Sequence, residues 1–384
     1  MRALLTAVLL VFGAAAQTPV PASRLESIQK YFEARPGDRP LRCNFFPIQP
    51  SLGFSMRFQA GYGLTVPLSQ YTGEGHRLAV ATRITPEGGQ PAYFVQRFRL
   101  GKIPATRART ELDGGYFLGE GHYAVECVLF DDSGRVARKA WRIDARRHRD
   151  ERVAKLAIPP ATVSELTAGI QPAHAAADAP PFRLTILLHA APLSPGHTRL
   201  RAADRVLLFT GLTSLLEQLP ARSVKLVVFN LEQQKEIFRQ ESFTPDALGG
   251  VWEALTALEL GVVNYAVLKN RGGGLDLLAG LLQQELHAGT PSDAVILFGP
   301  PGRTEGPSPR ELAQSRLDRP APRFYYFQYS PYPLVWMRRA GGLVRTNPLP
   351  FDGISRLVAP LQGKTMAIRS PGEFAKAIEQ VEKR

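Results

Sequence analysis

The stretch LTILLHAAPLSP, residues 184–195, holds the residues whose types and spacing are best suited to chemistry. A run of aliphatic residues ends at His189, and a hydroxyl, Ser194, follows five residues later. Ligands of α/β folds bind at the carboxyl ends of strands, and a histidine near a serine can form part of a nucleophile–base pair. However, the chain has no G-x-S-x-G motif, and no acidic residue is evidently placed to orient His189. The pattern favours a structural or interface histidine.

Other motifs for metal or phosphate chemistry are incomplete. The histidines at 174, 189, 197 and 287 do not have the H-E-x-x-H spacing of a zinc site. The run NRGGG, residues 270–274, is not followed by the Gly-Lys-Ser/Thr of a phosphate-binding loop. We therefore expect no catalytic residue, no bound metal and no cofactor.

Residues 1–16 are typical of a signal peptide. Arg2 precedes an apolar run that ends near three alanines, Ala14 to Ala16, which fits the small-residue rule for cleavage. The run is too short to span a bilayer comfortably, and no later stretch is long enough to do so. We expect an exported protein, periplasmic or extracellular, that starts at Gln17 and does not span the membrane.

The formal net charge of +13 favours anionic partners such as an envelope component. Export and the absence of RNA-binding or zinc-finger signatures argue against nucleic acid. A basic exported protein with solvated arginines remains an alternative.

Two cysteines, Cys43 and Cys127, are present. In an oxidising compartment an even pair indicates one disulfide. Two buried free thiols are the alternative, because spacing alone does not show contact.

After a helical segment at 17–40, the chain changes to alternating polar and apolar residues over 41–147. Short alternating runs are separated by turn sequences, such as DDSG at 131–134 between HYAVECVLF and RVARKAWRI. This pattern predicts an immunoglobulin-like β-sandwich. The run GEGHYAVEC is similar to the entry of a late strand in such domains, where the tyrosine, here Tyr123, bonds back to the preceding loop. A core tyrosine without that bond is the alternative.

A basic run and then an Ala/Pro-rich stretch, residues 148–181, predict a linker. The arginines near its start have two alternative roles. They either bind a polyanion or form a solvated face paired with nearby acidic side chains. From 182 to 384 strands and helices alternate. That order predicts a mostly parallel, Rossmann-like sheet with one antiparallel edge strand and helices on both faces.

The element order over 182–384, the hairpin strand KEIFRQESF and the ending SPGEFAKAIEQV resemble a von Willebrand factor A (vWA) domain. The resemblance is to the vWFA-related proteins exported by Acidobacteria-type bacteria. In that family a metal ion sits at the carboxyl end of the sheet, held by Asp-x-Ser-x-Ser, a Thr and a second Asp. By alignment of strand ends these positions fall on His189, Ala191, Leu193, Gly273 or Gly274, and Gly299. The resemblance therefore implies a degenerate site, because magnesium needs several hard oxygen ligands.

These observations predict an exported, non-enzymatic binding or scaffold protein. Its partner is a protein or an anionic envelope component, bound near His189, Ser194 and Arg303. Arg303 lies near the start of a long, basic, proline-rich stretch over 300–322, which is either a recognition loop or a disordered insertion. An envelope-associated, hydrolase-like enzyme with a site near His189, or a structural oligomer of the envelope, remains an alternative.

Overall fold

The chain folds into two compact units, each with its own core. The computed structural model describes residues 18–20, 25–33, 40–73, 75–166, 182–193, 199–260, 265–270, 272–302, 321–331 and 352–383. The first unit comprises residues 1–52, 57–146 and 158–168, and the second comprises 53–56, 147–157 and 169–384. The predicted leader, residues 1–16, lies outside the described residues. No described helix is long and apolar enough to cross a membrane.

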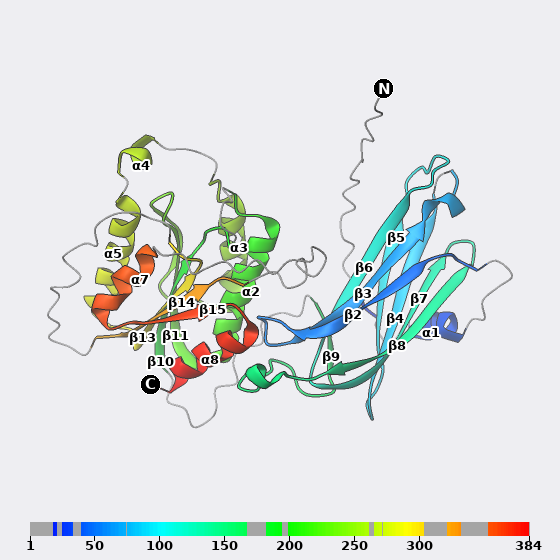
Figure 1. Ribbon diagram of the computed structural model, residues 1–384, viewed down its shortest axis with the longest axis horizontal. Helices are drawn as coiled ribbons and strands as arrows, with labels where there is room; N and C mark the ends of the chain where they lie inside the picture. The colour runs from blue at the N-terminus through cyan, green and yellow to red at the C-terminus, as the bar shows by residue number, and fades with distance from the viewer. Residues whose placement is uncertain are drawn as a thin grey trace. The chain divides into compact units, whose positions relative to one another are not determined.

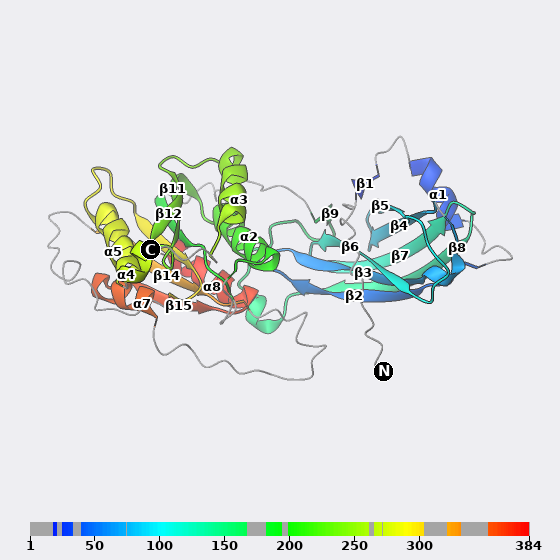
Figure 2. The same ribbon diagram turned by 90° about the horizontal axis from the view of Figure 1, so that it is seen from above.

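The first unit is built from two antiparallel sheets (Figure 1). One sheet has the order β1 (Thr18–Pro19), β5 (Ala92–Arg99), β4 (Arg77–Pro86), β7 (Gly121–Asp131) and β8 (Val136–Ala145). The other has the order β2 (Asn44–Leu52), β3 (Phe58–Pro67), β6 (Arg109–Leu118) and β9 (Val163–Glu165). Figure 2 shows the two sheets as separate layers, with helix α1 (Leu25–Glu33) on the outer side of the first.

Alternation along the strands creates the core between these sheets. Tyr62 and Leu64 of β3 face Val80 of β4 and Leu129 of β7, and all four are fully or almost fully buried. On the outer side of β4 and β7, Ala81 and Val128 pack against Ile28 and Phe32 of α1. A sheet with one face in a core needs such alternation, which is why the sequence pattern predicted antiparallel strands here.

Tyr123 makes the bond that its sequence context predicted. Its hydroxyl donates to the carbonyl oxygens of Gly119, at 2.9 Å, and Thr162, at 3.2 Å. The first bond closes the turn between β6 and β7. The second ties that turn to the segment that leads into β9, which lies inside the range predicted as a linker. That range therefore contains an edge strand, because β9 pairs with β6.

Cys43 and Cys127 are free thiols in this structure, and both pack in the core between the two sheets. Burial raises the pKa of Cys43 to about 12, and it raises the pKa of Cys127 as well. The neighbouring Cys43 raises the pKa of Cys127 further. The two thiols thus share one environment, and their pairing in an oxidising compartment remains a prediction.

The second unit is organised around a six-stranded sheet of order β12-β11-β10-β13-β14-β15. The strands are β10 (Phe182–His189), β11 (Ala221–Asn230), β12 (Lys235–Gln240), β13 (Ala294–Gly299), β14 (Arg323–Tyr329) and β15 (Lys364–Ile368). Only β12, at one edge, pairs antiparallel; the other described pairings are parallel. The predicted mixed sheet, mostly parallel with one antiparallel edge strand, is confirmed.

Helices cover both faces of this sheet (Figure 1). They are α2 (Ala202–Gln218), α3 (Leu248–Ala257), α5 (Gly273–Leu286), α7 (Gly353–Val358) and α8 (Pro371–Glu382), and the short α4 (Tyr265–Lys269) precedes α5. Leu297 of β13 belongs to the core formed with α5 and α7. Its neighbour Phe298 points the other way, toward Gly211 of α2 and Phe374 of α8. Both faces of β13 are therefore buried, as its uninterrupted apolar run requires.

The tyrosine bond in the first unit can be tested by removing one oxygen atom. Tyr123→Phe should lower the free energy of unfolding by about 1–2 kcal/mol, because the buried carbonyl of Gly119 loses a donor and the bond to the part-buried carbonyl of Thr162 is also lost. Urea denaturation measures this change. Tyr265→Phe, at a residue that is 75% exposed, is the control and should have no measurable effect. Equal stabilities of the two variants would contradict the role assigned to Tyr123.

Candidate functional site

The candidate site lies where β10 and β13 end side by side in the second unit. The strand order reverses at this pair. The next strand along the chain, β11, lies on one side of β10, and β13 lies on its other side. Open α/β sheets bind ligands at the carboxyl ends of strands near such a point. His189 is the last residue of β10, and Gly299 is the last residue of β13.

His189 is buried in this position, with only 3% of its surface exposed. Its ring stacks on Phe229 of β11, with 5.4 Å between ring centroids. Burial lowers the pKa of His189 to about 4, and the bond to Pro300 and the charge of Asp352 offset only part of this effect. The imidazole is therefore neutral at pH 7. Nδ1 lies 3.0 Å from the carbonyl oxygen of Pro300, and because a carbonyl only accepts, Nδ1 carries the proton.

Gly299 makes the close packing of the two strand ends possible. Its φ angle of +150° is one that residues with a side chain rarely adopt. A Cβ atom at this position would lie 2.5 Å from the carbonyl oxygen of His189 and 2.8 Å from its Cβ. The space that a carboxylate at position 299 would need is therefore already filled by His189.

Asp352 is an acidic group whose charge acts on His189, and it caps the start of α7. One carboxylate oxygen accepts from the backbone N–H groups of Gly302, at 3.0 Å, and Ile354, at 3.1 Å. The other accepts from Gln328 Nε2, at 2.7 Å, and from the hydroxyl of Ser355, at 2.9 Å. With both oxygens engaged, Asp352 fastens the segment after β13 to β14 and α7.

The sequence interpretation missed Asp352. An aspartate before the apolar-periodic run of GISRLV, residues 353–358, is typical of a helix N-terminus, and this was the available signal. Its partners Gly302 and Gln328 lie 50 and 24 residues earlier in the chain, so only the fold brings them together.

Other residues singled out from the sequence lie as follows. Ala191 is buried, Leu193 is half-buried, and Gly273 and Gly274 are buried at the start of α5. Asn230, at the end of β11, donates to the carbonyl oxygen of Ala190 at 2.7 Å and so holds the chain that leaves β10. Ser194 and Arg303 lie outside the described residues.

The described residues at this edge do not by themselves supply a complete set of groups for either of the two chemistries considered at the outset. A catalytic histidine needs a carboxylate or similar group to orient it, whereas Nδ1 of His189 bonds to a backbone carbonyl. Magnesium needs several free oxygen ligands. The positions that face each other here are a histidine ring and a glycine, and the oxygens of Asp352 are already taken by four donors.

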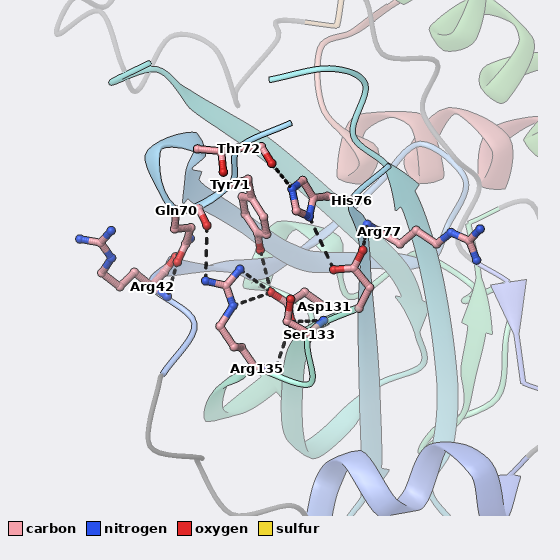
Figure 3. Close-up of polar contacts among 10 residues, drawn as sticks. Arg42, Gln70, Tyr71, Thr72, His76, Arg77, Asp131, Ser133 and Arg135 are labelled. Carbon is pink, nitrogen blue, oxygen red and sulfur yellow. Dashed lines mark hydrogen bonds and ion pairs between the residues drawn. The ribbon is translucent and has the colours of Figure 1, made fainter. Parts of the chain in front are cut away.

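A second polar cluster lies in the first unit, and its members bond to one another (Figure 3). Asp131 ends β7 and accepts from the backbone N–H groups of Ser133, at 3.0 Å, and Arg135, at 2.9 Å, which closes the predicted turn. It also accepts from Nε of Arg135 at 2.8 Å and from the hydroxyl of Tyr71 at 3.3 Å. The Arg135 guanidinium lies 4.9 Å from the centre of the Tyr71 ring. We assign this cluster to the stability of the β-rich unit.

Comparisons with known proteins do not place the chain in a family. No family model matches it, and no curated protein matches it. Among solved structures, an ApaA protein from Bordetella pertussis is similar over 29% of this chain and 98% of its own, with 9% identity and a TM-score of 0.19. The sporulation control protein Spo0M from Bacillus subtilis covers 29% of this chain and 51% of its own, with 9% identity and a TM-score of 0.15.

A Bacteroides uniformis beta-glucuronidase is similar over 88% of this chain and 44% of its own, with 11% identity and a TM-score of 0.21. Similarities at this level assign neither a fold nor a function.

The packing of Gly299 against His189 can be tested with one methyl group. Gly299→Ala should destabilise the second unit by about 3 kcal/mol, since it combines backbone strain with a clash. Gly280→Ala, in α5 where a Cβ would meet nothing within 4 Å, is the matched control and should stabilise by up to about 1 kcal/mol. Hydrogen exchange of the β10 and β13 amides reports both changes. A Gly299→Ala protein as stable as the native one would refute the packing argument.

The buried neutral histidine makes stability depend on pH. The pKa of His189 is about 4 in the folded protein and about 6.5 in an unfolded chain, so protons bind the unfolded chain first. The contribution of His189 to the free energy of unfolding should therefore fall by about 3 kcal/mol between pH 7 and pH 4. His189→Phe keeps a ring on Phe229 and removes this loss. Urea denaturation of both proteins at the two pH values measures the difference, and identical pH dependence would contradict the assignment.

Proposed function

We propose that this protein is an exported, non-enzymatic binding or scaffold protein. Its second unit is a vWA-like domain that has lost the metal-ion-dependent adhesion site, and its first unit is an immunoglobulin-like β-sandwich. The partner is a protein or an anionic component of the cell envelope. It binds at the carboxyl edge of the parallel sheet without a bridging metal ion or a cofactor.

The observation that carries this proposal is the closed edge between β10 and β13. The six-stranded sheet, mostly parallel with one antiparallel edge strand, is consistent with the element order on which the vWA resemblance rests. In that alignment the two metal-binding aspartates fall on His189 and Gly299. Gly299 leaves no room for a side chain, and His189 is neutral and bonded to Pro300. The residues present do not fit a magnesium ion, so binding must rely on other contacts.

The loops that leave this edge supply those contacts under the proposal. Ser194 follows β10, and Arg303 follows β13 by four residues. His189 was expected among the partner-binding residues, but at 3% exposure it offers little surface. Its bond to Pro300 instead anchors the start of the 300–322 stretch. Arg303 then provides a positive charge suited to an acidic partner.

A pulldown from envelope extract tests the proposal. Tagged protein lacking residues 1–16 should retain its partner in EDTA, because no metal bridge is involved. Arg303→Glu should weaken retention about tenfold or more, because it reverses a charge at the interface. Arg222→Glu is the control. Arg222 is an exposed arginine at the start of β11, on the amino edge of the sheet.

Two results would contradict the proposal. One is loss of the partner in EDTA together with a rise in melting temperature when magnesium or manganese is added. The other is an equal effect of the Arg303→Glu and Arg222→Glu substitutions on retention.

A further inference from the structure

A separate hollow lies on the outer face of the β4–β7–β8 sheet in the first unit. Its volume is about 430 Å³, which is within the range of sites for small ligands. The strand register explains why it is there. Thr85, Ala124 and Arg142 lie side by side across β4, β7 and β8, and Arg83, Glu126 and Ala140 form the adjacent row. The two alanines leave open space between longer side chains.

Four of the six side chains in these rows give the hollow its chemistry. Ala124 and Ala140 form an apolar floor, and Pro91, from the loop between β4 and β5, adds an apolar wall. Thr85, with its hydroxyl, and Arg142, with its guanidinium, are the cross-strand neighbours of Ala124 on its two sides. A ligand lying over Ala124 would therefore meet a polar group at each end of an apolar surface.

The charged side chains around the hollow differ in whether they have an ion-pair partner. Glu126 is paired with Arg83, and Nε of Arg138 lies 3.4 Å from its other oxygen. The Arg83 guanidinium also lies 4.9 Å from the centre of the Phe32 ring, which holds it against α1. Arg142 is exposed and has no hydrogen-bond or ion-pair partner within the described part of the chain. Arg83 and Arg142 against Glu126 leave the lining with a net charge of +1.

We infer that this hollow binds a small monoanion, a carboxylate attached to a compact apolar body. The carboxylate pairs with Arg142, the one lining cation that is not already engaged, and the apolar body lies over Ala124 and Ala140. A single free guanidinium neutralises one negative charge, while Glu126, beside Ala140 on the middle strand, repels a second. A carboxylate is therefore favoured over a phosphate dianion. This site is independent of the edge between β10 and β13, so it extends the proposed function.

Benzoate is a suitable probe, and inorganic phosphate is the comparison. Each is added at constant ionic strength to the full chain, in which the alanine methyl groups are labelled with ¹³C. Saturable shifts of the Ala124 and Ala140 methyl signals are expected with benzoate, and weaker ones with phosphate. Arg142→Gln should weaken benzoate binding about tenfold, as expected for loss of a hydrogen-bonded charge. Arg97→Gln is the matched control, because Arg97 is exposed on the same face of the sheet, on the neighbouring strand β5, but does not line the hollow.

A second variant tests the hollow without changing any charge. Ala124→Leu fills the floor and should abolish the benzoate-dependent shift of Ala140 while Arg142 stays in place. The inference is overturned if benzoate gives no saturable shift, if Arg142→Gln and Arg97→Gln have equal effects, or if Ala124→Leu still binds. Tighter binding of phosphate than of benzoate would overturn the choice of a monoanion.

Discussion

The contact between Gly299 and His189 sets what the carboxyl edge of the parallel sheet can do. β10 and β13 are neighbours in register from Leu184 and Ala294 onward, so their last residues meet at the point where a ligand would enter. The glycine lets the strand ends approach until no Cβ atom fits between them. The histidine ring then stacks on Phe229, and its Nδ1–H donates to the carbonyl oxygen of Pro300.

Two consequences follow from this contact. Between the described ends of β10 and β13 the space is filled by His189, so a carboxylate at position 299 has no room to hold an ion. The chain that leaves β13 is also fixed for its first residues, because Pro300 bonds to His189 and Gly302 bonds to Asp352. A binding surface built on the following residues therefore starts from a rigid base. Rigid elements that hold variable loops are the usual way in which such folds present binding residues.

Local patterns were enough to predict much of this architecture. The aliphatic run at 182–189, the polar turn that separates 224–231 from 235–243, and the alternation around Tyr123 each reflect a constraint within one or two elements. Contacts between distant segments were not predictable in the same way. Asp352 has partners at 302 and 328, and the row of Thr85, Ala124 and Arg142 depends on the register of three strands. Such juxtapositions arise only when the sheets have formed.

The most direct test of this account is the protonation state of the His189 ring. Nitrogen-15 NMR of the imidazole distinguishes the two neutral tautomers and follows titration. We expect the tautomer with its proton on Nδ1, unchanged from pH 8 to pH 5, because the bond to Pro300 selects it and burial keeps the ring neutral. A ring protonated on Nε2, or one that titrates near pH 6.5, would contradict the closed edge on which the account depends.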